Sequence, residues 1–80
     1  MTDWKDHIVV DPEILVGKPI IKGTRISVEL IMDRLADGWT LEDITAAYPR
    51  VTRSDVLAAI AFVTQVFSEG DYVATRMASA

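Results

Sequence analysis

The sequence predicts a mainly α-helical fold in which a three-helix, helix-turn-helix core follows a small N-terminal β element. Up to about residue 27, short β-branched runs alternate with glycine and proline. From residue 28 onward, apolar residues recur at helical spacing in three segments, each preceded by a capping residue. Eighty residues are enough for one domain. We therefore expect a single domain over 1–80, with a β/turn element at 1–27, the helical core at 28–69 and a C-terminal tail at 70–80.

The β element is expected to contain three short extended pieces. The run His7–Val10 is rich in β-branched residues and stops where Asp11, followed by proline, can cap a single turn. Two further pieces, Pro19–Ile21 and Arg25–Ser27, flank a Lys-Gly pair. Gly23 can supply the positive φ that a tight corner requires, so the sequence favours a hairpin there.

The first two helices carry clear start and stop signals. Ser27 is placed to cap the first helix, and Gly38 to end it. Thr40 and Asp43 form the Thr-x-x-Asp pattern of a capping box, and Pro49 stops the second helix. The apolar stripes expected to face the core comprise Val28, Ile31, Met32 and Leu35 in the first helix, and Leu41, Ile44, Ala47 and Tyr48 in the second.

The third helix is expected to begin after the Thr52–Asp55 capping pattern and to run to about Ser68, closed by Gly70. Its apolar arc spans roughly 160°, wider than the 100° or so of a helix that buries only one face. The excess predicts a contact with a second chain. The residues expected to make partner or dimer contacts are Leu57, Phe62 and Val66, joined from the tail by Tyr72 and Met77.

DNA contact is the competing interpretation of this helix, and a frayed terminus is the competing interpretation of the tail. A DNA-reading helix carries arginine, asparagine or glutamine near its N-terminal end. Here only Arg50, Arg53 and Ser54 are available, beside the acidic Asp55. These three residues are the candidate DNA-binding set.

The stretch from Gly17 to Arg25 is rich in glycine and cations but lacks the spacing of a phosphate-binding loop. We expect a structural motif instead, with the glycines at corners. In that interpretation Arg25 is partly buried and pairs with carbonyls and with a carboxylate such as Asp11 or Glu13, although contact with a partner molecule stays open. The motif residues are Gly17, Pro19, Gly23, Thr24 and Arg25.

Composition excludes several classes of function. The sequence has no cysteine and a single histidine, His7, which argues against a zinc or imidazole-rich metal site. No nucleophile–histidine arrangement stands out, and helix caps and faces explain the carboxylates. We expect no catalytic residue, no metal, no cofactor and no small-molecule substrate, so the protein is not expected to be an enzyme.

Charge and hydropathy bear on partners and location. Twelve acidic against eight basic residues give a net charge of −4, which disfavours strong DNA binding and suits a basic protein partner. No apolar run approaches the roughly 18 residues of a membrane span. The start of the chain does not resemble a signal peptide, so we expect a cytoplasmic protein without membrane contact.

Residues Ile8–Phe67 resemble the bacterial and archaeal domain of unknown function 433 family. The shared motifs are an Asp-Pro start, Gly-Lys-Pro, Gly-Thr-Arg-Ile-Ser-Val, a glycine closing the next helix, Tyr-Pro and an alanine-rich last helix. Val16 departs from the pattern, because the family usually carries glycine there, and this leaves the local turn type open. The resemblance implies a homeodomain-like fold, a tendency to dimerise, and similarity to antitoxins whose toxin is a PIN-like ribonuclease.

These observations favour one function and leave a second open. The first is an antitoxin of a type II toxin–antitoxin pair: a homodimer that binds and neutralises a PIN-like toxin. Such an antitoxin would also bind its operator DNA weakly and repress its own operon. The alternative is a dimerisation or scaffold module without DNA binding.

Overall fold

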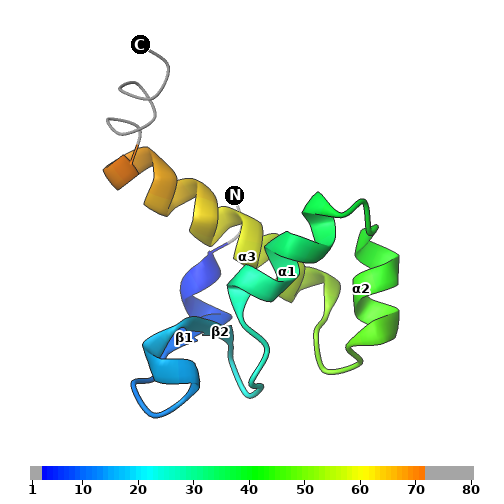
Figure 1. Cartoon of the computed structure of the whole chain (residues 1–80), viewed down its shortest axis with the longest axis horizontal. Helices are drawn as coiled ribbons and strands as arrows, with labels where there is room; N and C mark the ends of the chain where they lie inside the picture. Colours follow the sequence, from blue (N-terminus) through cyan, green and yellow to red (C-terminus); the bar gives the residue numbers. More distant parts are fainter. Residues whose placement is uncertain (1–2, 72–80) are drawn as a thin grey trace.

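The computed structural model describes residues 3–71, with side chains described as far as Glu69. Residues 72–80 of the expected tail, including the expected contact residues Tyr72 and Met77, lie outside the described residues. Three helices follow a two-stranded sheet, as the sequence predicts (Figure 1). In chain order the elements are the short 3₁₀ helix η1 (Trp4–Asp6), β1 (Ile8–Val10), the 3₁₀ turn η2 (Leu15–Gly17), β2 (Pro19–Ile21), α1 (Val28–Ala36), α2 (Leu41–Ala47), α3 (Arg53–Val66) and one wider π-helical turn, η3 (Phe67–Asp71).

The sheet pairs β1 with β2 in antiparallel register, Ile8 opposite Ile21 and Val9 opposite Ile20. The hairpin expected between Pro19–Ile21 and Arg25–Ser27 is reduced to a tight corner with a single antiparallel bridge, from Ser27 to Ile20. The backbone N–H of Ile21 already donates to Ile26 across a tight corner, and α1 begins immediately after Ser27. Too few residues remain to extend a ladder.

At the corner itself, Gly23 adopts the positive φ that the sequence predicts, and Thr24 closes the loop. Gly23 has a φ of 79°, in the left-handed region that glycine adopts without a steric penalty. The Thr24 hydroxyl donates to the carbonyl of Ile21 at 2.8 Å and accepts from the N–H of Ile26 at 3.0 Å. These bonds close the loop around one threonine side chain.

The connection from β1 to β2 contains an unusual backbone. Leu15, Val16 and Gly17 all have positive φ, at 50°, 57° and 78°. A β-branched residue is disfavoured in this region because its Cβ crowds the following carbonyl. Val16 is also 95% exposed, so little packing offsets the strain. Val16, the position at which the sequence departs from the family that it resembles, thus has a backbone conformation that glycine would fit better.

The three helices begin at the predicted caps. Ser27 Oγ accepts from the N–H of Leu30, and capping boxes form between Thr40 and Asp43 and between Thr52 and Asp55. Most of the predicted stripe residues are buried or half-buried, with Ile44 fully buried, but Ala47 is exposed. The third α-helix ends at Val66, slightly before the predicted Ser68, and continues into η3.

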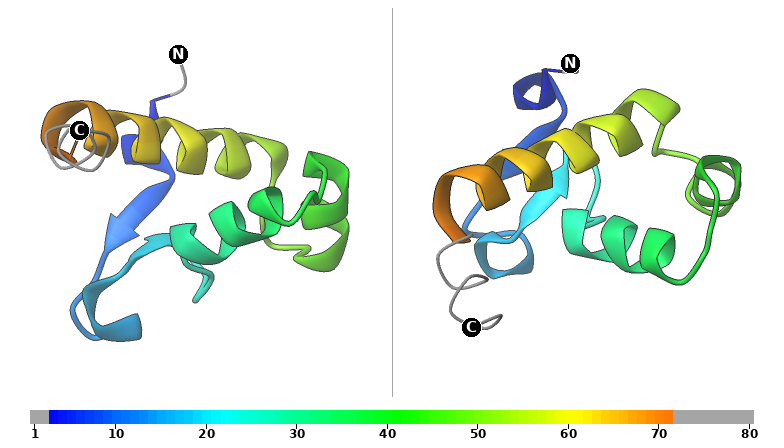
Figure 2. Two further views of the ribbon diagram at one scale, coloured as in Figure 1. Left: turned by 45° about the horizontal axis from the view of Figure 1, so that its top comes forward. Right: turned by 90° about the horizontal axis from the view of Figure 1, so that it is seen from above.

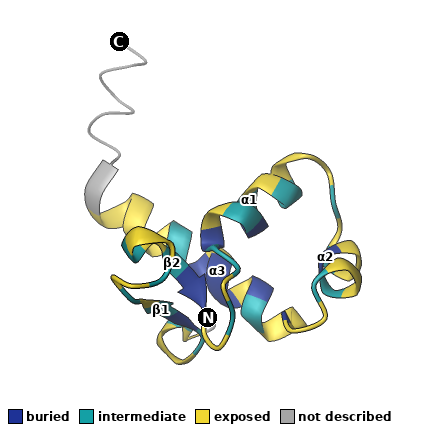
Figure 3. Ribbon diagram, turned by 60° about the horizontal axis from the view of Figure 1, so that its bottom comes forward, coloured by how far each residue is buried: buried dark blue, intermediate teal, exposed yellow. Residues whose placement is uncertain are grey.

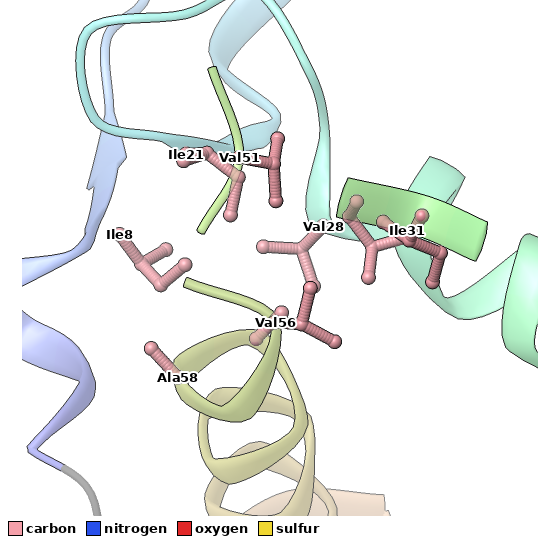
Figure 4. Packing of buried hydrophobic residues seen from close by; sticks show 9 residues of the cluster. Ile8, Ile21, Val28, Ile31, Val51, Val56 and Ala58 are labelled. Atoms are coloured by element: carbon pink, nitrogen blue, oxygen red, sulfur yellow. The ribbon is translucent and has the colours of Figure 1, made fainter. Parts of the chain in front are cut away.

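One apolar core joins the sheet to all three helices. Ile8 and Ile21 point from one face of the sheet toward Val28 of α1 and Val56 of α3, as Figure 4 shows. Small side chains on α3 allow the close approach of its neighbours, since Ala58 and Ala59 are fully buried. The remaining members of the buried cluster are Ile31, Ile44 and Val51.

The N-terminal segment packs on α3 and uses part of its apolar arc. The ring of Trp4 meets that of Phe62 edge-on, with centroids 4.8 Å apart, and its Nε1 donates to Gln65 Oε1 at 2.7 Å. In Figure 2 this N-terminal segment lies alongside α3. Phe62, expected to contact a second chain, therefore makes its aromatic contact within its own chain. The apolar arc of α3 is wider than packing on α1 and α2 alone requires, partly because η1 covers one side of it.

Candidate functional site

His7 and Asp55 form a partly buried polar contact between segments 48 residues apart in the chain. Nδ1 of His7 and Oδ1 of Asp55 are 2.8 Å apart, while Oδ2 of Asp55 accepts from the N–H of Thr52 at 3.0 Å. Burial alone would raise the pKa of Asp55, but the hydrogen bonds from Thr52 and His7 outweigh it and lower that pKa below its ordinary value. An ionised Asp55 only accepts, so His7 donates.

This pair serves structure, because it ties the residue before β1 to the start of α3. Both carboxylate oxygens of Asp55 are engaged, Oδ1 by His7 and Oδ2 by the N–H of Thr52. The carboxylate is therefore not placed as a free base beside a nucleophile. Within residues 3–71, no group of three or more histidine or acidic side chains is arranged to hold a metal ion. In the same part of the chain, no helix is long and apolar enough to cross a membrane.

The exposed side of α3 carries a stripe of mostly apolar residues. Leu57 and Ile60 are each 36% exposed, Phe67 is 50% exposed, and Thr64 between them is exposed as well. Figure 3 shows the C-terminal half of the helix largely exposed. We call these four residues the α3 stripe: Leu57, Ile60, Thr64 and Phe67.

Their spacing of three, four and three residues is the spacing of a helix that packs along another helix. The stripe begins at Leu57, which the sequence placed among the contact residues. Val66, also expected there, is 46% exposed but lies nine residues from Leu57, on the opposite side of the helix. The exposure of Ile60 was not predicted from the sequence. Its position in the continuous apolar arc of the helix does not show which part of that arc is buried.

The three candidate DNA-binding residues are exposed but do not share one surface. Arg50 lines a groove beside the β element, together with Arg25 and Asp11. Arg53 lines a smaller hollow against α2, with Leu41 and Glu42. The two arginines therefore flank the start of α3 on different sides.

Ser54 is exposed at the same helix end, and the stripe continues from it with Leu57 and Ile60. Leucine and isoleucine at the positions where a recognition helix meets base edges offer no hydrogen bonds to the bases. The exposed face of α3 is thus better suited to a protein surface than to the major groove.

The structure corrects the expectation for Arg25. It is exposed, and among the side chains and carbonyls of residues 3–69 none receives a hydrogen bond from it. Asp11, one of the two carboxylates named as a possible partner, accepts from the N–H of Glu13 through Oδ1 at 2.9 Å. The β2–α1 corner is held by Thr24, so it does not need the arginine.

A second cluster that the sequence did not reveal joins α1 to α2. The guanidinium of Arg34 lies 5.3 Å from the ring centre of Trp39, and its Nε donates to the Tyr48 hydroxyl at 3.3 Å. That hydrogen bond raises the pKa of Arg34. Trp39 and Tyr48 stack with centroids 6.4 Å apart. The cluster links the end of α1 to the end of α2 through one cation, one indole and one phenol.

Comparisons with known proteins agree with this architecture. The sequence profile described as "Protein of unknown function (DUF433)" matches residues 8–63. A crystal structure of a DUF433 member protein from Anabaena variabilis ATCC 29413 superposes with a TM-score of 0.71 at 22% sequence identity. The match covers 95% of this chain and 71% of that one. The comparison with curated proteins finds no match.

Proposed function

Because the chain belongs to the DUF433 family, whose function is unknown, we propose from its own surface that it is a small dimeric protein-binding module of the antitoxin type. The observation that carries this proposal is the α3 stripe. An exposed helix face with apolar residues at the spacing of a helix pair is a surface built for another protein segment.

The first occupant of the stripe is a second copy of the chain. Two α3 helices laid side by side would bring Leu57 and Ile60 of each copy against the other, which removes four aliphatic side chains from water. A chain of 80 residues buries only a modest core, so an interface of this kind adds stability that the monomer lacks. The heptad-like spacing supports the helix-pair geometry.

The antitoxin role rests on charge and on the resemblance to antitoxin-like proteins. A net charge of −4 on so small a chain attracts a basic partner and speeds its encounter. In the pairs that the sequence resembles, the partner is a PIN-like ribonuclease. The dimer presents two copies of every surface, so one assembly has room for two toxins.

DNA binding is a weaker, secondary part of the proposal. Arg50 and Arg53 are the cations nearest the start of α3, and they lie on different sides of it. With so few phosphate contacts, binding of the free dimer to its own promoter should be modest and should depend only shallowly on salt. Replacing both arginines by glutamine should abolish specific retardation of that promoter in a gel.

The test is co-expression with the protein encoded next to it. A tagged copy should co-purify with that neighbour in a fixed ratio, and the purified complex should lack the ribonuclease activity of the neighbour alone. Substitution of Leu57 and Ile60 by glutamate should break the dimer and lower recovery of the complex. If the neighbour is not a nuclease and the dimer still forms through the α3 stripe, the scaffold alternative holds and the antitoxin role fails.

A further inference from the structure

A groove with a volume of about 520 Å³ lies between the β element and the turn that precedes α3. Its two rims come from segments that are far apart in the sequence. Arg25 belongs to the corner between β2 and α1, and Arg50 belongs to the connection between α2 and α3. The groove is separate from the α3 stripe, because none of the four stripe residues lines it.

Both rim arginines are free to bind. Each is exposed, and no carboxylate in residues 3–69 forms an ion pair with either one. Asp11 is the acidic residue that lines the groove, and one of its oxygens is engaged by the N–H of Glu13. Two guanidinium groups therefore face one groove against a single, partly engaged carboxylate.

The floor of the groove is apolar for a reason set by the sheet. Strand residues alternate between faces, so Ile8 and Ile21 enter the main core while Val9 and Ile20 point to the opposite face. Ile20, which lines the groove, is only 1% exposed and does not belong to the main buried cluster. Around it the floor is completed by Val9, Ile14 and Ile26, all half-buried.

We propose that this groove binds an acidic peptide segment of a partner protein, in which an apolar side chain lies next to carboxylates. The carboxylates would accept bidentate hydrogen bonds from Arg25 and Arg50, and the apolar side chain would cover the floor above Ile20. This binding activity stands independently of the proposed dimer, since none of the α3 stripe residues lines the groove. Arg50 is shared with the proposed DNA contact, so a DNA duplex is one of the probes in the test.

A peptide fits these features better than a nucleic acid does. DNA phosphates would also pair with the two arginines, but a backbone of phosphates and sugars leaves the apolar floor uncovered. The chain as a whole is acidic, so it repels a polyanion such as DNA. The repulsion of a short peptide with one or two carboxylates is much smaller. The positive charge is confined to the two arginines of the groove, and a small acidic segment matches the size of the groove.

The experiment measures binding of a fluorescein-labelled peptide in which glutamate alternates with leucine, by fluorescence anisotropy on the full chain. A second peptide with glutamine in place of glutamate, and a labelled DNA duplex, are the comparison probes. The glutamate–leucine peptide should bind with a Kd well below about 1 mM. The glutamine peptide should bind at least tenfold more weakly, because each charge-assisted contact to arginine is worth about tenfold in affinity.

The variant pair separates the groove from general charge. Arg25→Gln with Arg50→Gln should weaken peptide binding at least tenfold. The control Lys5→Gln with Arg53→Gln removes the same charge outside the groove, so it should leave binding within about twofold. Both variants should melt like the unmodified chain, since all four side chains are exposed.

Three results would overturn the proposal. The first is no peptide binding up to about 1 mM. The second is equal loss in the two double variants, which would mean a general charge effect. The third is duplex binding that is lost in the Arg25 and Arg50 variant while the peptide fails to bind, which would make the groove a phosphate-binding surface.

Discussion

The two capping boxes of this chain provide a matched pair for measuring the contact between His7 and Asp55. Asp43 at the start of α2 and Asp55 at the start of α3 hold the same position and make the same bonds with their threonines. Asp55 differs by accepting a further hydrogen bond from His7, at 2.8 Å. The difference between Asp55→Ala and Asp43→Ala therefore isolates that contact.

The magnitudes follow from the structure. Loss of one capping bond costs about 1 kcal/mol, which applies to both variants. A hydrogen bond to a charged group is worth about 1.5–3 kcal/mol. The side chains of His7 and Asp55 stay 29% and 15% exposed, and solvent screening reduces the contribution to about 1 kcal/mol. Asp43→Ala should then lower Tm by about 5 °C and Asp55→Ala by about 10 °C.

The assay is thermal denaturation followed by circular dichroism at pH 7, with His7→Ala and the His7/Asp55 double variant completing a mutant cycle. The cycle should return a coupling of about 1 kcal/mol between the two side chains. Equal losses for Asp55→Ala and Asp43→Ala, with zero coupling, would refute the argument that this pair fastens the β element to α3.

The pH dependence of the same pair has a defined sign. The pKa of Asp55 is lowered in the folded chain from an ordinary value of 3.8. Its contribution to stability is therefore complete above pH 3.8 and is lost as the pH falls through the lowered pKa. The Tm difference between the unmodified chain and Asp55→Ala should be constant near neutral pH and should shrink below about pH 4.

Three further substitutions test other parts of the fold by the same thermal assay. Val16→Gly should raise Tm by about 4 °C, because relief of about 1–2 kcal/mol of left-handed strain exceeds the entropic cost of glycine; a lower Tm would contradict the strain. Arg25→Ala should leave Tm unchanged, since its side chain has no partner in the described chain, and a fall of several degrees would restore the structural role. Trp4→Ala should lower Tm by about 10 °C through loss of the edge contact to Phe62 and the bond to Gln65, and an unchanged Tm would show that η1 does not pack on α3.

The helical core was predictable because its signals are local. Each helix is preceded by one capping residue, namely Ser27, Thr40 or Thr52. Each cap accepts a hydrogen bond from an N–H three residues later, so a short segment of sequence is enough to predict where the helix starts. Gly38 ends α1 for the same local reason, with a φ of 95°.

The β element and the surfaces were less predictable because they depend on long-range contacts. Pro19–Ile21 forms its ladder with β1, which begins eleven residues earlier in the chain, and makes only one bridge to the nearer Arg25–Ser27. The local sequence alone favoured the nearer partner. Only tertiary structure places Trp4 on α3 and brings Arg25 and Arg50 to the same groove. The width of the apolar arc on α3 correctly indicated a surplus of apolar surface, but periodicity alone could not divide it between η1 and the exposed stripe.

Light scattering coupled to size exclusion tests the central claim most directly, namely that the α3 stripe joins two copies of the chain. The unmodified protein should elute with twice the 8.9 kDa mass of the chain. Leu57→Glu with Ile60→Glu should elute at 8.9 kDa while keeping its helical circular dichroism, because both side chains are partly exposed in the monomer. Val66→Glu, on the opposite side of the helix, should remain dimeric. A monomeric unmodified chain, or a dimer that persists in the Leu57 and Ile60 variant, would contradict the account.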